Sequence, residues 1–115
     1  MGLESKRCTP CEKGSPPLDE DGENNLLKQV PWEIDRNGTH KIRKQFTLGD
    51  FKEAMGFVNR VAELAEQEKH HPDIHISYRN VTIELSTHAV GGLSENDFIL
   101  ASKLDNMVKE TGEPA

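Results

Sequence analysis

Residues 51–65 carry apolar side chains at the spacing of one face of an α-helix, and this segment constrains the fold more than any other. The apolar positions recur every three or four residues, with polar or charged positions between them. We expect Thr47-Leu48-Gly49-Asp50 to begin the helix as a capping box and Pro72 to end it by His71. The apolar face comprises Phe51, Ala54, Met55, Val58, Val61, Ala62 and Ala65.

Two pairs of alternating segments predict the surface that this helix covers. Asn37-Gly38 is a two-residue hairpin signal between residues 32–35 and 40–46. Residues 74–78 and 81–88 alternate in the same way, with a turn near Arg79-Asn80. Further helices are expected over residues 18–29 and after Leu93, where Ser94 and Asp97 form a second capping box. The predicted fold is a two-layer α+β domain of order αββαββα, with a four-stranded antiparallel sheet and three helices on one face.

The bulk composition limits the domain organisation and the classes of partner. The 115 residues fit one domain, expected over 18–110, between a flexible leader (1–17) and a frayed tail (111–115). A net charge of -6 argues against direct nucleic-acid binding and against docking on an anionic membrane. No apolar run approaches the roughly 18–20 residues of a membrane-spanning helix, so we expect a cytoplasmic protein. An aromatic content of only 5% fits an oligomer that buries additional surface.

Cys8 and Cys11 form a Cys-Thr-Pro-Cys pair within the expected leader. One such pair supplies half of a tetrahedral zinc site. A thioredoxin-type redox motif would follow a strand and open a helix, whereas this pair lies in a segment rich in proline, glycine and serine. The favoured interpretation is a reduced pair of minor structural importance, with a metal or redox site as the alternative.

Three histidines are expected at one end of the sheet. His70 and His71 leave the long helix together, and His88 ends the last predicted strand. Since that strand runs back toward the start of its hairpin partner, His88 should lie close to His70 and His71. Three imidazoles can act as general acids and bases near neutral pH, can bind a metal ion, or can be surface residues beside a turn. The residues alone leave these three interpretations open.

The segment Lys69-His70-His71-Pro72-Asp73-Ile74, followed by Ser86-Thr87-His88 and Gly92-Leu93-Ser94-Glu95-Asn96-Asp97, resembles the pterin-4a-carbinolamine dehydratase family. Trp32, Lys44-Gln45-Phe46 and the run from Phe57 to Ala62 support the resemblance, which extends from about Leu18 to Val108.

The resemblance implies a lyase that removes water from 4a-hydroxytetrahydrobiopterin to give quinonoid dihydropterin, and so recycles tetrahydrobiopterin. It implies no metal or organic cofactor, and a homodimer or homotetramer. The alternative that it leaves open is a non-enzymatic pterin-binding or protein-interaction module, since some animal members act as transcriptional dimerisation cofactors. The implied catalytic residues are His70, His71 and His88, and the implied substrate-binding residues are Glu66, Asp73, Ser86 and Thr87.

Two positions depart from relatives of this family. Lys69 stands where Asp or Asn is frequent, and Asn96 stands where some relatives have arginine. Both departures are expected to affect ligand contacts and rate rather than the fold.

Overall fold

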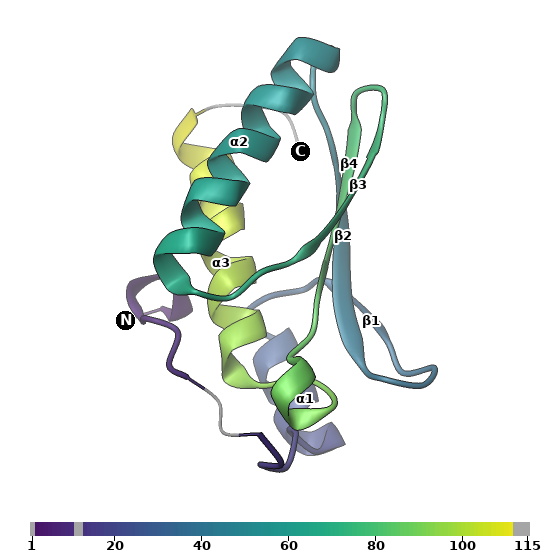
Figure 1. Cartoon of the computed structure of the whole chain (residues 1–115), viewed down its shortest axis with the longest axis vertical. Coiled ribbons are helices and arrows are strands. Elements are labelled where there is room, and N and C mark those ends of the chain that lie inside the picture. Colours follow the sequence, from purple (N-terminus) through teal and green to yellow (C-terminus); the bar gives the residue numbers. More distant parts are fainter. Residues whose placement is uncertain (1, 11–12, 112–115) are drawn as a thin grey trace.

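An antiparallel sheet forms one layer of the protein, and α-helices cover one of its faces (Figure 1). The computed structural model describes residues 2–10 and 13–111. In these residues the sheet has four strands in the order β1-β2-β4-β3. The predicted fold class and element order αββαββα are confirmed. The elements are β1 (Glu33–Asp35), β2 (Lys41–Thr47), β3 (Asp73–Ser77), β4 (Asn80–Leu85), α1 (Glu20–Leu27), α2 (Phe51–Glu68), α3 (Glu95–Thr111) and the 3₁₀ turns η1 (Leu3–Ser5) and η2 (His88–Val90).

The core lies between α2, α3 and the helix-facing side of β2 and β4. Alternate residues of β4 are buried, and its Leu85 pairs with Ile42 of β2. Phe46 of β2 stacks at a tilt against Phe57 of α2, with ring centroids 4.9 Å apart. Trp32 is buried as expected, and its indole donates a hydrogen bond to Asp105 on α3. Within the described residues, no helix is both long enough and apolar enough to cross a membrane.

Helix α2 begins later than the sequence suggested. Asp50 is the N-cap, and its carboxylate accepts from the Glu53 amide at 2.8 Å. Glu53 in turn accepts from the Gly49 amide at 2.8 Å, which satisfies a second donor at this helix end. The predicted cap at Thr47 is wrong because Thr47 is the last residue of β2, where its hydroxyl bonds to Asn80.

The C-terminal end of α2 is set by Lys69 rather than by Pro72. Lys69 has a left-handed backbone, with φ of 55°, and the His70 amide then donates to the Ala65 carbonyl at 3.1 Å. This left-handed cap ends the helix at Glu68, before the region that Pro72 restricts. A non-glycine residue in this conformation carries a cost of about 1 kcal/mol, which neighbouring contacts must offset.

The β3–β4 hairpin differs from the expectation at both ends. Its turn falls on Tyr78 and Arg79, one residue earlier than predicted, and Tyr78 takes a positive φ of 56°. Strand β4 stops at Leu85, so His88 lies in η2 and not in the strand. The hydrogen bond from the Thr87 amide to the Gly92 carbonyl, at 2.7 Å, closes the loop that carries His88.

Residues 2–10, which we call the N-terminal segment, lie against the helices. Leu3 is buried in the core, and the Lys103 ammonium of α3 donates to the Glu4 carbonyl at 2.8 Å. The sequence led us to expect a flexible leader over residues 1–17, and a single buried leucine leaves no periodic pattern that would indicate these contacts. Residues 1, 11 and 12 of that leader lie outside the described residues, as do residues 112–115 of the predicted tail.

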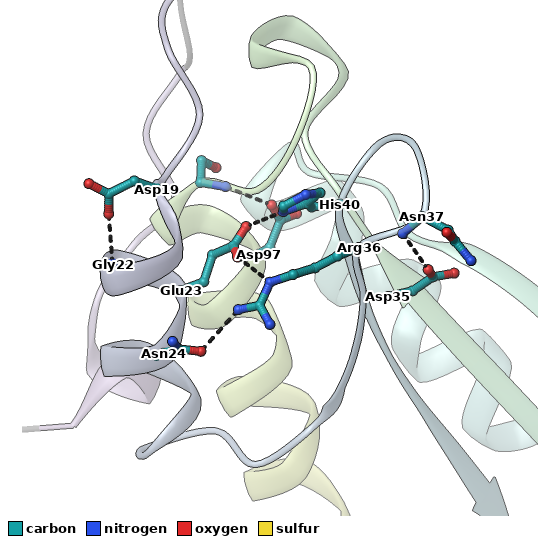
Figure 2. A network of polar contacts seen from close by, with 10 residues as sticks. Asp19, Gly22, Glu23, Asn24, Asp35, Arg36, Asn37, His40 and Asp97 are labelled. Carbon is teal, nitrogen blue, oxygen red and sulfur yellow. Dashed lines mark hydrogen bonds and ion pairs between the residues drawn. The ribbon is translucent and has the colours of Figure 1, made fainter.

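A buried carboxylate ties α1 to the β1–β2 hairpin (Figure 2). Glu23 is fully buried and accepts from Arg36 Nε at 3.0 Å, while His40 Nδ1 lies 2.7 Å from its other oxygen. Arg36 also donates to Asn24 at 2.9 Å. Because a buried charge is costly without partners, these contacts fix the position of α1 beside the hairpin turn.

Candidate active site

A cavity of about 650 Å³ lies where the residues that follow α2 meet the residues that follow β4. His70, His71 and His88 all line it, so the structure brings the three predicted histidines together. Ser86 and Thr87, two of the predicted substrate-binding residues, line the same cavity. The hairpin explains this arrangement, because Asp73 at the start of β3 pairs with Glu84 near the end of β4.

His70 is held by a buried aspartate. Its Nε2 lies 2.6 Å from Asp97 Oδ1, and the side chains of His70 and Asp97 are only 11% and 0% exposed. The second carboxylate oxygen of Asp97 accepts from the Thr87 hydroxyl at 2.8 Å and from the Ser94 amide at 2.9 Å. One carboxylate therefore joins the exit of α2, the loop after β4 and the start of α3.

This hydrogen-bond pattern determines which ring nitrogen of His70 can react. An ionised carboxylate only accepts hydrogen bonds, so Asp97 requires a proton on Nε2 of His70. The neutral ring then keeps the lone pair on Nδ1, which can take up a proton. The contact with Asp97 therefore orients the His70 ring.

The other two histidines are more open to solvent. His71 pairs through Nε2 with Glu66, and the two side chains are 62% and 75% exposed. An exposed pair of this kind contributes little to stability, so its main effect is to limit the orientations of the His71 ring. His88 is exposed and opens η2, whose turn depends on Gly91 at a positive φ of 71°. A glycine suits that backbone conformation, which side chains disfavour.

Two of the predicted binding residues do not line the cavity. Glu66 pairs with His71, which lines the cavity, and Asp73 is an exposed residue at the start of β3. Asp97 is the opposite case, since the sequence identified it only as part of a capping box. It does cap α3, because it accepts from the Ser94 amide, but it also orients His70. A carboxylate at a helix start can serve both purposes, and no local pattern indicates the second one.

The N-terminal segment supplies another side of the cavity. Arg7, Cys8, Thr9 and Pro10 line it together with the histidines, and none of the four was predicted as a site residue. Burial, with the nearby carboxylates of Glu68 and Asp97, raises the pKa of the Cys8 thiol to about 12. The thiol is therefore neutral at physiological pH, and thiolate chemistry is suppressed there. Cys11 lies outside the described residues, so the metal and redox interpretations of the cysteine pair stay open.

Glu68 anchors this segment. Its carboxylate accepts from the Cys8 amide at 2.9 Å and from Arg7 Nε at 3.1 Å, and Lys103 Nζ lies 3.8 Å away. Burial alone would raise the pKa of Glu68, but the Cys8 amide and the two cations outweigh burial and hold that pKa below its ordinary value.

Within the described residues, no group of three His, Cys, Asp or Glu side chains is placed to hold a metal ion.

Glu68→Gln should lower stability in a pH-dependent way. Because folding lowers the pKa of Glu68, its carboxylate stabilises the folded state above the ordinary value of 4.5 and loses this effect as the pH falls below it. Urea denaturation should show a loss of about 1–2 kcal/mol at pH 7, fading toward pH 3. The control is Glu63→Gln, which changes an exposed carboxylate on the same helix. An equal loss at all pH values would contradict the expectation.

Comparisons with known proteins identify the family of the chain. A family model described as "Pterin 4 alpha carbinolamine dehydratase" matches residues 16–107. A protein of Nitrosomonas eutropha is 44% identical over 108 residues, which covers 92% of this chain and 93% of that protein. One from Methylococcus capsulatus is 43% identical over 109 residues, covering 94% and 95%. Both carry the name pterin-4-alpha-carbinolamine dehydratase as a provisional assignment.

Two solved structures are also similar. A transcriptional coactivator/pterin dehydratase from Brucella melitensis superposes with a TM-score of 0.74 at 30% identity, covering 79% of this chain and 97% of that one. A pterin dehydratase-like protein identified as a RuBisCO assembly factor has a TM-score of 0.57 at 22% identity, covering 66% and 87%, which shows a shared fold. The family match spans most of the chain, and the relatives are matched over nearly their whole length. The chain therefore belongs to the pterin-4a-carbinolamine dehydratase family.

Proposed function

We propose that the protein removes water from 4a-hydroxytetrahydrobiopterin to give quinonoid dihydropterin, by acid/base catalysis with histidines. The observation that carries this proposal is the His70–Asp97 pair, which lies on the same cavity as His71 and His88. Family membership supports a dehydratase, and a cavity of about 650 Å³ is large enough for a bicyclic pterin ring.

The reaction needs one proton donor and one proton acceptor. His88, in its protonated form, gives a proton to the 4a-hydroxyl group as the bond from C4a to oxygen breaks, and water leaves. The electron pair of N5 forms the new double bond to C4a, and Nδ1 of His70 takes the N5 proton. Asp97 stabilises the resulting imidazolium of His70, and both histidines return to their starting states by exchange with solvent.

The assignment of His70 as the base rests on its buried carboxylate partner, which favours a ring that gains positive charge. His88 is exposed, so solvent can reprotonate it between turnovers. His71 is proposed to position the pterin, since its pairing with Glu66 restricts the ring. Thr87 positions Asp97 through its hydroxyl, and Ser86 lies beside it on the cavity.

His70→Ala and His88→Ala should each lower kcat by about 10²- to 10⁴-fold, which is the usual contribution of a positioned acid or base. The measurement is stopped-flow decay of the 4a-carbinolamine, with far-UV circular dichroism to show that the fold survives. His75→Ala is the control, because His75 is an exposed histidine of β3 that does not line the cavity. Rates like those of the unaltered protein in both variants would refute the assignment.

Asp97→Asn should lower kcat by about 10- to 1000-fold, because an amide can donate to Nε2 and so favour the wrong tautomer of His70. The pH profile of kcat should shift as well, which loss of a helix cap alone would not cause. Asp105→Asn is a matched control on α3, since Asp105 accepts from Trp32 and Lys44 away from the cavity. Equal losses in the two variants, without a shifted profile, would count against Asp97 as a positioning residue.

A role in protein interaction is the second candidate, and the exposed edge of the sheet favours it. Strand β3 lies at one end of the strand order and leaves Ile76 and the turn residue Tyr78 41% and 65% exposed. An open edge with apolar side chains can pair with another chain, and we propose a homodimer or homotetramer formed there. The Brucella relative is described as a transcriptional coactivator as well as a dehydratase.

Ile76→Lys should shift the protein from a dimer or tetramer to a monomer, because a lysine at an open edge opposes pairing. Size-exclusion chromatography with light scattering measures the mass directly. Glu63→Lys, which introduces a lysine at an exposed position of α2 and not on the edge strand, is the control and should keep the mass of the unaltered protein. A monomeric unaltered protein would exclude this interface.

A further inference from the structure

We propose that residues 7–10 form a wall of the cavity that contacts the substrate, and that Asn96 is the positioning residue that holds this wall in place. The inference rests on the proposed function and adds to it. The family model begins to match at residue 16, so this wall lies outside the region that the model describes. Arg7, Cys8, Thr9 and Pro10 nevertheless share one cavity with His70, His71 and His88.

The side-chain amide of Asn96 forms hydrogen bonds to the backbone of the wall through both its oxygen and its nitrogen. Its Oδ1 accepts from the Thr9 amide at 3.0 Å, and its Nδ2 donates to the Thr9 carbonyl at 2.6 Å. The Cys8 thiol lies 3.6 Å from the Asn96 carbonyl, as a donor to it. Asn96 is itself only 6% exposed, so these contacts are partly shielded from water. A side chain that satisfies the donor and acceptor of one residue fixes both its position and its rotation.

The wall is also held on its other sides. Glu68 accepts from the Cys8 amide and pairs with Arg7, and upstream of them Leu3 is buried in the core. Glu68 and His70 are separated by a single residue, and Asn96 directly precedes Asp97. The same two short stretches that position the His70–Asp97 pair therefore position the wall. Its distance from the reacting histidine is set by local geometry at both anchors.

The chemistry of the wall suits a planar, polar heterocycle. The neutral Cys8 thiol and the Pro10 ring add uncharged surface, and sulfur makes favourable contacts with aromatic rings. Arg7, the charged member of the wall, is already paired with Glu68 at 3.1 Å. A wall of this kind can contact the pterin ring without competing for the protons that the histidines exchange.

Asn96→Ala in the full chain tests the inference. Release of Thr9 should raise the KM for the 4a-carbinolamine by about 10-fold, because the two hydrogen bonds that fix the wall are lost. The change in kcat should stay within about 2-fold, since the His70–Asp97 pair is kept. Lys6→Ala is the matched control: it removes an exposed ion pair between the same segment and Glu95. Its KM should not change.

Hydrogen–deuterium exchange gives a readout that does not depend on turnover. A dihydropterin without the 4a-hydroxyl group serves as the probe, and its binding should slow exchange in residues 2–10 of the unaltered protein. Asn96→Ala should show fast exchange there with and without the probe. An unchanged KM in Asn96→Ala would refute the proposal that residues 7–10 contact the substrate. Exchange in residues 2–10 of the unaltered protein that the probe does not alter would refute it as well. An unaltered protein that neither binds the probe nor accelerates dehydration would instead refute the proposed function.

Discussion

The carboxylate of Asp97 is the interaction on which the site depends. It is fully buried, and it accepts from the Ser94 amide, from the Thr87 hydroxyl and from the imidazole of His70. A buried carboxylate without such partners would carry a large desolvation cost, so these donors have to be held in place together. The start of α3, the loop after β4 and the exit of α2 are thereby fixed relative to one another. The cap of a helix and the orientation of a proposed catalytic histidine are one structural feature here.

A second buried carboxylate likewise connects separate elements, at the hairpin of β1 and β2. Glu23 of α1 is paired with Arg36 and His40, which flank the turn between β1 and β2 (Figure 2). The short helix α1 contains Gly22, Asn24 and Asn25, and such residues favour a helix poorly. Tertiary contacts, rather than intrinsic propensity, therefore account for its stability. The Asp19 cap, which accepts from the Gly22 amide at 2.8 Å, adds a local contribution.

Much of the fold was predictable from the sequence, because the strand alternation and the helical spacing of Ala54, Val61 and Ala65 are strong periodic signals. The meeting of His88 with His70 and His71 was also predictable, since a hairpin returns the chain to its starting point. The cap at Asp50 and the left-handed Lys69 were missed, because the ends of elements depend on which neighbours compete for each hydrogen bond. The role of Asn96 was missed for another reason. Its contact with Thr9 joins residues 87 positions apart, and no local pattern encodes such a distance.

The register of the second hairpin separates two parts of the molecule that could change independently. Asp73 is opposite Glu84 at the end near the histidines, and Ser77 is opposite Asn80 at the tip. Residues added to or removed from the tip in matched pairs leave the first pairing unaltered, and each side chain stays on its own face of the sheet. The distance between the residues that follow α2 and those that follow β4 would also stay the same. Within one family, the tip around Tyr78 is therefore free to diversify toward different partners while the cavity keeps its shape.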